Sequence, residues 1–377
     1  MKIFMVVNFF PEDLSLGITQ KVNSQIATLR SMGNEVFYTA YKNNGVSIFN
    51  NDDVEIMHRK FPINNSKIFG FCKSFFLDNT AKKYVSDKKF NLGYIRWRGL
   101  GSTTINLLKV LAENCKQVVM DTHGYFPGYS YSFKNLSKKY LEISVKKNQD
   151  KVGKYLDLIL SETEEKTIFG VKSMKYDNGV NIKETKSHHY LGDPNELNLI
   201  SVANESIYHG YNRIIRSIKA CENSNIHITL HLVGTVMKST VTLIKQLNLE
   251  NYIILHGKQY GETLDKIFDL CNVGIGPVSQ HLTGGKQGTG LKTKLYFAKG
   301  LPFIYSGHEL LVPSNYPYIM KVSDDESIID FEKVYDFYLS IKDRNIVDDM
   351  REFADKNFSW EKTYKIMFEI LNNKNIL

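Results

Sequence analysis

Short apolar runs alternate along the chain with longer segments in which apolar residues recur every three or four positions. The run KIFMVVN (2–8) has the length and composition of a buried strand, and residues 18–32 carry the periodicity of one helix face. Further strands are predicted at 35–40, 92–97, 117–121 and 156–161, with helices near 102–114 and 133–154. This order predicts a parallel sheet covered by helices.

The same rhythm starts again after a hydrophilic segment, KETKSHHYLGDPNE (183–196). The second series is predicted as strands at 197–203, 227–234, 252–257, 273–278 and 302–306, with helices near 211–222, 238–247, 261–271 and 291–299. We therefore expect an α/β protein with two Rossmann-like, doubly wound parallel-sheet domains, residues 1–185 and 195–356, facing a cleft. Ligands of such sheets bind at the carboxyl ends of the strands.

Composition adds that this is a soluble, globular type of chain. Its 377 residues are 42% hydrophobic and 23% charged. The four cysteines, Cys72, Cys115, Cys221 and Cys271, are scattered and form no CxxC pair, which excludes a disulfide framework and a zinc site and favours a reducing cytoplasm. The apolar run at the start is too short for a signal peptide, and no window of 18 apolar residues predicts a membrane span.

Positive charge is concentrated in the first half. Residues 1–190 hold 28 Lys and Arg against 18 Asp and Glu, and the remainder holds 20 against 22. A basic first half indicates either an anionic partner, such as a membrane surface or a lipid-linked phosphate, or a solvated face without a partner. The sequence has no recognisable nucleic-acid-binding motif, so we expect no nucleic-acid partner.

The stretch LTGGKQGTGLKTKLYFAKGLPFIYS (282–306) is the most informative local pattern. Its four clustered glycines are Gly284, Gly285, Gly288 and Gly290. Glycines before a helix let backbone amides approach an anion, and the helix N-terminus favours phosphate. Lys292 and Thr293, in the first turn, would add a charge and a hydroxyl, Leu291, Leu295 and Ala298 are expected to face the core, and Gly300 ends the helix.

Two alternatives to this phosphate cradle remain. The first is a P-loop, GxxxxGK[ST]. It is disfavoured because one extra residue stands between Gly290 and Lys292 and because the stretch comes late in its domain. The other alternative is a flexible glycine loop at the surface.

Five segments together resemble the retaining glycosyltransferases of family 4, which have the GT-B fold. They are MKYDNGVNI (174–182), SVANESIYHGYNRIIRSI (201–218), HLVGTVMKS (231–239) with NYIILHGKQYGETLDKIFDLCNVGIGPV (251–278), LKTKLYFAKGLPFIYS (291–306) and FSWEKTYKIMFEIL (358–371). The resemblance implies a nucleoside-diphosphate sugar as donor substrate, with no other cofactor, bound by the second domain. It also implies that a C-terminal helix, 357–377, crosses back to the first domain.

Carried over residue by residue, the resemblance puts Asn204 and His209 where the family usually has the arginine and lysine that bind the diphosphate. The family's two glutamates fall on Gln287 and Leu295. Gln287 retains hydrogen-bonding groups for a sugar, whereas Leu295 cannot hydrogen-bond a ribose. We therefore expect Lys292 to be the main cation at the phosphates. The expected donor-binding residues are Gly17, Asn204, His209, Gly210, Lys258, Gln287, Gly290, Leu291 and Thr293.

The resemblance assigns the acceptor to the first domain. Arg96 and Arg98 follow a predicted strand and suit a phosphate-bearing acceptor, with a pair of surface charges as the alternative. Asp121 and His123 end another strand and would orient and deprotonate the acceptor hydroxyl, and Tyr125 would stack on a sugar; a structural Asp–His pair is the alternative. Asp121, His123 and Lys292 are therefore the expected catalytic residues.

The resulting hypothesis is a retaining glycosyltransferase of surface-polysaccharide synthesis. It would act without a metal, because no DxD motif is present in the expected cleft, and would use a glycan acceptor on a lipid carrier. The protein would be cytoplasmic, with its basic first domain contacting the inner membrane surface. The substitutions at Asn204, His209, Gln287 and Leu295 leave open an inactive partner subunit, and the two-domain architecture leaves open a sugar-nucleotide epimerase.

Overall fold

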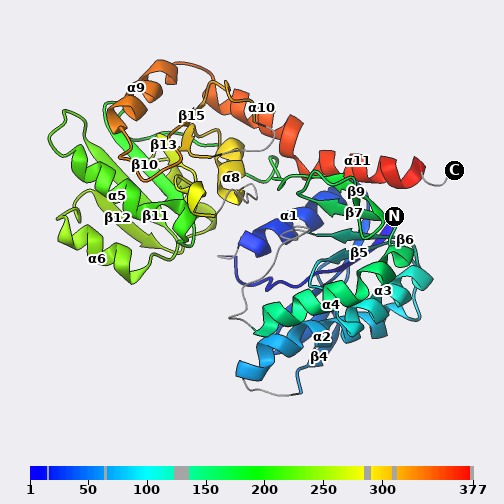
Figure 1. Cartoon of the computed structure of the whole chain (residues 1–377). Coiled ribbons are helices and arrows are strands. Elements are labelled where there is room, and N and C mark those ends of the chain that lie inside the picture. Colours follow the sequence, from blue (N-terminus) through cyan, green and yellow to red (C-terminus); the bar gives the residue numbers. More distant parts are fainter. Residues whose placement is uncertain (15–16, 63–65, 123–135, 284–289, 308–311, 374–377) are drawn as a thin grey trace. The chain divides into compact units, whose positions relative to one another are not determined.

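The computed structural model describes residues 1–14, 17–62, 66–122, 136–283, 290–307 and 312–373. The chain divides into two compact units (Figure 1). Unit 1 is Met1–Tyr176 together with Glu361–Leu377, and unit 2 is Asp177–Trp360. The hydrophilic segment 183–196 thus belongs to unit 2, and nearly all of α11 (Trp360–Asn373) belongs to unit 1. In the described residues, no helix is long and apolar enough to cross a membrane.

Unit 1 is built on a sheet whose described strands follow the order β4-β3-β2-β1-β5-β6-β7-β9-β8. Their bounds are β1 (Lys2–Val6), β2 (Glu35–Lys42), β3 (Gly45–Phe49), β4 (Glu55–Lys60), β5 (Phe90–Arg96), β6 (Cys115–Asp121), β7 (Leu158–Ser161), β8 (Thr167–Ile168) and β9 (Val171–Lys175). The predicted parallel pairing is confirmed for β2, β1, β5, β6 and β7, which are neighbours in the sheet in this order. The sheet as a whole is mixed, because β3, β4 and β8 pair antiparallel.

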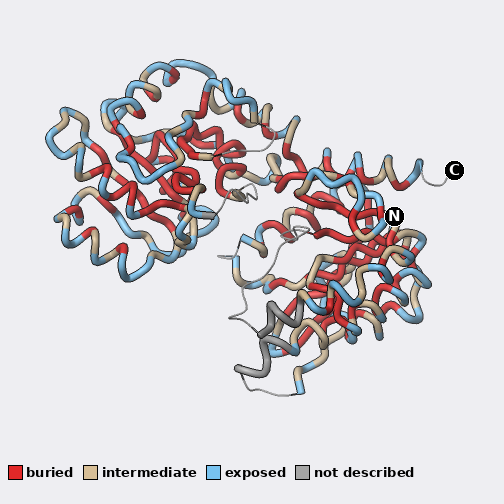
Figure 2. Tube along the Cα trace, in the orientation of Figure 1, coloured by how far each residue is buried: buried red, intermediate tan, exposed pale blue. Residues whose placement is uncertain are grey.

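Helices cover both faces of this sheet. They are α1 (Gly17–Ser31), α2 (Ser66–Val85), α3 (Ser102–Asn114), α4 (Leu136–Val152), the 3₁₀ turn η1 (Gly153–Tyr155) and α11. In Figure 1, α2, α3 and α4 lie together on one face, and α1 and α11 lie on the other. The central strands are the most buried segments (Figure 2), which explains their nearly continuous apolar sequences.

A tight hairpin extends the sheet beyond β2. Asn43 and Asn44 connect β2 to β3 with φ of 46° and 53°, the left-handed geometry of a two-residue turn that asparagine tolerates. Gly45 follows, where a Cβ would lie 2.4 Å from the carbonyl oxygen of Arg59 on β4. Neither β3 nor β4 was among the predicted strands. β4 is an exposed edge strand with little apolar alternation, and the short β3 is buried.

Unit 2 contains a parallel sheet whose described strands follow the order β12-β11-β10-β13-β14-β15. Their bounds are β10 (Leu197–Val202), β11 (Ile228–Val233), β12 (Ile253–Gly257), β13 (Val273–Ile275), β14 (Phe303–Tyr305) and β15 (Ile319–Lys321). The helices and 3₁₀ turns are η2 (Ile207–His209), α5 (Tyr211–Ala220), α6 (Lys238–Gln246), α7 (Gly261–Phe268), η3 (Gln280–Thr283), α8 (Leu291–Lys299), α9 (Phe331–Ile341) and α10 (Ile346–Phe358). The strand order reverses at β10, so its carboxyl end is the topological switch point.

Helix α8 begins and ends where predicted, at Leu291 and before Gly300, whose φ of 77° suits glycine. The predicted core face is only partly right. Ala298 is fully buried and Leu295 is partly buried against the core, but Leu291 is only partly buried, whereas Lys292, Lys294 and Lys299 are buried. The helix is enclosed because it packs on the sheet on one side and on α10 on another, so most of its circumference faces protein.

Candidate functional site

The switch point of unit 2 carries a buried lysine. Lys292, from the first turn of α8, extends to β10, where its Nζ donates a hydrogen bond to Ser201 Oγ at 3.3 Å. Ser201 Oγ also lies 3.4 Å from the carbonyl oxygen of Ile275, at the end of the neighbouring strand β13. The ammonium group is thus held at the carboxyl ends of two adjacent strands, where a doubly wound sheet binds its ligand.

His209 lies beside this lysine, in η2. Its Nδ1 accepts a hydrogen bond from the backbone N–H of Ser206 at 3.1 Å, which places the ring proton on Nε2. Burial, and secondarily the charge of Lys292, lowers the pKa of His209 to about 2. In this structure His209 is therefore neutral and can donate a hydrogen bond through Nε2–H.

The N-terminus of α8 completes the arrangement. Gly290 is its N-cap, without a side-chain capping bond, and the first helical bond is from Lys294 N to Gly290 O at 3.5 Å. The backbone N–H groups of the first turn therefore point out of the helix end, where the helix dipole favours an anion. Thr293 does not direct its hydroxyl outward, because Oγ1 donates to Gly290 O at 2.8 Å.

Close packing holds η2 against the loop that follows β13. Gly210 has a φ of 71°, and a Cβ there would lie 2.6 Å from Ser279 Oγ. Arg213 fixes the same loop, donating to the carbonyl oxygens of Val278, Ser323 and Ser327. Arg213 was not among the predicted residues, because an arginine on an amphipathic helix has the same local pattern whether it is solvated or buried.

A buried ion pair anchors α8 from within unit 2. Lys294 Nζ lies 2.9 Å from Asp177 Oδ2, with side chains 0% and 2% exposed. The same Nζ lies 4.3 Å from the ring centroid of Phe358. Asp177 immediately precedes the NGV segment singled out in the sequence, but nothing local indicated its partner. The pair therefore ties α8 to the segment at Asp177, two residues along the helix from Lys292.

The other expected donor-binding residues are less central. Asn204 is exposed, and its Oδ1 accepts a hydrogen bond from Thr235 N. Lys258 is exposed after β12, the outer strand, and β11 separates β12 from β10. Gln287 lies outside the described residues, as do Gly284, Gly285 and Gly288. In unit 1, Gly17, another expected donor-binding residue, is the exposed first residue of α1.

Asp121 of unit 1 is a buried acceptor of hydrogen bonds. It is fully buried at the end of β6, and its carboxylate accepts hydrogen bonds from Tyr176 at 2.5 Å and Tyr94 at 2.9 Å. Lys21 and Gln25 of α1 donate in turn to these two tyrosine hydroxyls. Burial, and secondarily the charge of Asp121, raises the pKa of both tyrosines well above its ordinary value, so both remain donors.

The arginines after β5 have different surroundings. Arg96 is half-buried at the carboxyl end of β5. Arg98 is enclosed and forms an ion pair with Asp78, which also accepts hydrogen bonds from Thr103 and Thr104. A role for Arg98 in acceptor binding would require its side chain to leave this pair. The predicted partners His123 and Tyr125 lie outside the described residues.

Comparison with solved structures shows the fold. The chain resembles a glycosyltransferase from Rickettsia africae over 99% of both chains, at 15% identity and a TM-score of 0.64. It resembles HepE from Anabaena in complex with UDP over 99% of this chain and 100% of that one, at 15% identity and a TM-score of 0.59. For sucrose-phosphate synthase from Thermosynechococcus elongatus, coverage is 100% and 99%, identity 13% and TM-score 0.66. No family model and no curated protein sequence matches the chain. The fold is GT-B, as predicted.

Proposed function

We propose that the protein is a retaining glycosyltransferase that moves a sugar from a nucleoside-diphosphate sugar to a glycan acceptor. The observation that carries the proposal is the convergence of Lys292, His209 and the N-terminus of α8 at the carboxyl ends of β10 and β13. A buried cation, a neutral N–H donor and a helix N-terminus suit a diphosphate. The similar HepE has been solved with UDP and with UDP-glucose, and the same class of donor would bind here.

In the proposed reaction the bond between the anomeric carbon and the diphosphate oxygen breaks, and the acceptor oxygen attacks the same face of the sugar. The acceptor hydroxyl loses its proton, and the diphosphate leaves with the bonding electron pair. Lys292 and the amides at the start of α8 stabilise the negative charge that develops on the diphosphate, and His209 donates through Nε2–H. Positioning and electrostatic stabilisation of this kind account for much of a transferase's rate.

Unit 1 supplies the acceptor side of this proposal. Arg96 would bind a phosphate-bearing acceptor, and Tyr125 would stack on one of its sugars. Asp121 and His123 would orient and deprotonate the acceptor hydroxyl; with Asp121 buried, His123 would be the member of the pair that contacts the acceptor. A lipid-linked glycan at an anionic membrane surface fits the excess of basic residues in the first half of the chain.

Thermal unfolding in the presence of sugar nucleotides tests the proposal. We expect UDP-glucose, or another member of a panel of UDP- and GDP-sugars, at about 100 times its Kd to stabilise the native protein by about 2.7 kcal/mol. That stabilisation corresponds to a rise in Tm of roughly 5–10 °C for a domain of 150–250 residues. A panel without any stabilising member would contradict donor binding.

Lys292→Met should weaken the binding of that sugar nucleotide roughly 10- to 150-fold, the effect of losing a hydrogen bond to a charged group. Each variant is compared with its own ligand-free Tm, so a change in basal stability does not enter. The matched control is Lys238→Met, which removes an exposed lysine from α6 of the same unit. Equal ligand shifts in the two variants would remove Lys292 from the site.

The competing hypothesis of an inactive partner subunit makes a different prediction. A transferase releases UDP or GDP slowly from its donor by hydrolysis, even without acceptor, and an inactive subunit does not. An epimerase would instead convert the donor sugar without releasing the nucleotide. Chromatography of the nucleotide products after prolonged incubation distinguishes the three.

A further inference from the structure

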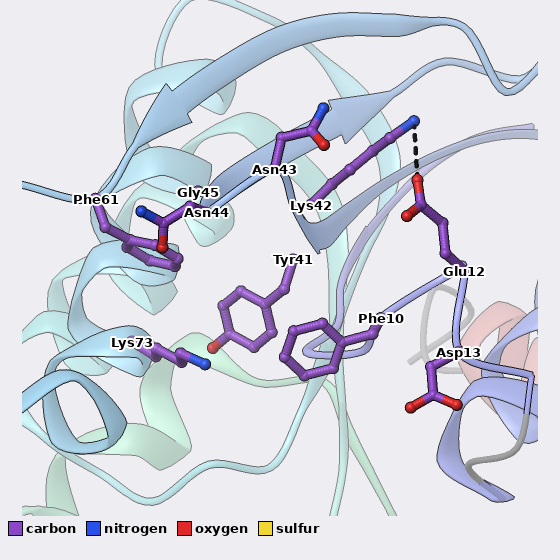
Figure 3. Close-up of a pocket in the computed structure, with 10 residues that line it drawn as sticks. All are labelled: Phe10, Glu12, Asp13, Tyr41, Lys42, Asn43, Asn44, Gly45, Phe61 and Lys73. Atoms are coloured by element: carbon purple, nitrogen blue, oxygen red, sulfur yellow. Dashed lines mark ion pairs between the residues drawn. The ribbon is translucent and has the colours of Figure 1, made fainter. Parts of the chain in front are cut away.

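Unit 1 contains a cavity of about 600 Å³ that the proposed donor site does not use (Figure 3). It lies among the segment 10–13 after β1, the hairpin turn 41–45, Phe61 and Lys73 of α2. β1 and β2 are parallel neighbours, so the segments that follow them meet at the carboxyl edge of the sheet, and Tyr41 N donates to Phe9 O at 2.9 Å. The cavity has the size of a small-molecule site, about 300–1,000 Å³.

Aromatic rings form one wall of this cavity. The ring centroids of Phe10 and Tyr41 are 5.3 Å apart, and those of Tyr41 and Phe61 are 6.2 Å apart. Figure 3 shows Phe10 beside Tyr41, with Lys73 extended toward them; its Nζ lies 5.3 Å from the Phe10 centroid. Phe10 is 42% exposed, so part of its apolar ring is accessible to a ligand.

The other residues that line the cavity are mostly polar, and the charges around it balance. Lys42 and Lys73 contribute two positive charges, and Glu12 and Asp13 two negative ones. Lys42 Nζ lies 3.5 Å from Glu12 Oε1, so these two groups already compensate one another. A phosphate or a uronic acid would meet the two carboxylates, whereas an uncharged ligand with hydroxyl groups would find both donors and acceptors.

The amide side chains of the hairpin turn add further hydrogen-bonding groups. Asn43 and Asn44 form the turn that connects β2 to β3, where asparagine tolerates the positive φ, and both residues line the cavity. The aromatic rings suit a ligand with one face of C–H groups. The carboxylate, amide and ammonium groups suit hydroxyl groups around the edge of that ligand. A pyranose ring has this chemistry.

We propose that this cavity binds an uncharged sugar ring of a glycan, with the ring stacked on Phe10 and its hydroxyls bonded by Glu12, Asp13 and Asn44. Assigning that ring to the acceptor rests on the proposed function, whereas binding of the sugar does not. Burial raises the pKa of Tyr41 to about 12, so its hydroxyl stays protonated beside the ring.

Saturation-transfer NMR on the full chain, without any nucleotide, tests the proposal. The probes are the methyl α-glycosides of glucose, mannose and N-acetylglucosamine, with glucose 6-phosphate and glucuronate as charged counterparts. We expect at least one neutral glycoside to bind through its C–H protons and more tightly than either charged sugar. Phe10→Ala should weaken that binding roughly 3- to 10-fold, from the loss of an aromatic stacking partner.

Two further variants complete the design. Ile56→Ala is the matched control: Ile56 lies on β4 of the same unit, is 43% exposed and does not line the cavity. Asn44→Gly removes the amide but keeps a residue suited to the positive φ, and it should also weaken binding. The proposal is overturned if none of the three neutral glycosides binds, if a charged sugar binds more tightly, or if Phe10→Ala behaves like Ile56→Ala. Since no donor is present, these results are independent of whether unit 2 binds a sugar nucleotide.

Discussion

Replacing Lys294 by methionine should destabilise unit 2 strongly, because it removes the ammonium group that is paired with the buried carboxylate of Asp177. The two side chains are 0% and 2% exposed, their charged atoms are 2.9 Å apart, and Lys294 Nζ also lies over the ring of Phe358. Breaking a buried ion pair by removing one partner costs about 3–5 kcal/mol. Methionine has nearly the same length as lysine, so the volume of the site changes little and the loss reports the charge.

The second half of the prediction concerns the pair as a unit. Asp177→Asn also removes a partner, but the amide can still accept a hydrogen bond from Asn178 N, which now reaches Asp177 Oδ1 at 2.6 Å. The double variant Lys294→Met with Asp177→Asn contains no buried charge at this position. We therefore expect its loss of stability to be smaller than the sum of the single losses by roughly 1–3 kcal/mol.

The chain offers its own reporters for this measurement. It contains two tryptophans, Trp97 in unit 1 and the buried Trp360 in unit 2. A Cβ at Gly179 would lie 2.5 Å from the Trp360 ring, so this ring packs on the backbone two residues from Asp177. In a Trp97→Phe background, guanidinium unfolding followed by tryptophan fluorescence reports the surroundings of Trp360, while circular dichroism reports both units.

Two results would refute this reasoning. If Lys294→Met lowers the free energy of unfolding by less than about 1 kcal/mol, the pair contributes no more than an ion pair at the surface does. Strict additivity in the double variant would mean that the two side chains do not depend on one another. The control is Lys266→Met, whose exposed pair with Glu262 on α7 should cost less than about 0.5 kcal/mol.

Three further predictions address the remaining sites. The pKa of His209 is 6.5 in the unfolded chain and about 2 in the folded one, so the free energy of unfolding that depends on neutral His209 is fully present above pH 6.5 and declines as the pH falls. At pH 5 this loss of stability is about 2 kcal/mol. His209→Asn should not show the loss when unfolding is compared at pH 7.5 and pH 5. Gly210→Ala should cost roughly 1–3 kcal/mol, since φ is 71° and the added methyl group would collide with Ser279; an unchanged denaturation midpoint would argue against this backbone geometry. Arg98→Met should lower the stability of unit 1 by roughly 3–5 kcal/mol because the buried carboxylate of Asp78 loses its cation, and retention of full stability would return Arg98 to the acceptor-binding candidates.

Much of the fold could be predicted because its signals are local. Apolar runs marked most of the parallel strands of both sheets, and α8 begins and ends at the predicted residues because Gly290 and Gly300 set those limits. The hairpin strand β4 escaped prediction, since an edge strand that is mostly solvated needs no apolar alternation. Lys292 was found as a candidate because a helix N-terminus and a glycine run are visible in the sequence.

The surroundings of the candidate residues depended on contacts between distant parts of the chain. Nothing near Asp121 indicated that its carboxylate is held by tyrosines at positions 94 and 176, or near Lys294 that its partner is Asp177. A charged side chain is stable in the interior only beside a partner, and the partner's position is set by the packing of strands and helices. The sequence by itself therefore determined the order of elements and the chemistry available at their ends, and the tertiary structure decided which of those groups are buried, neutral or paired.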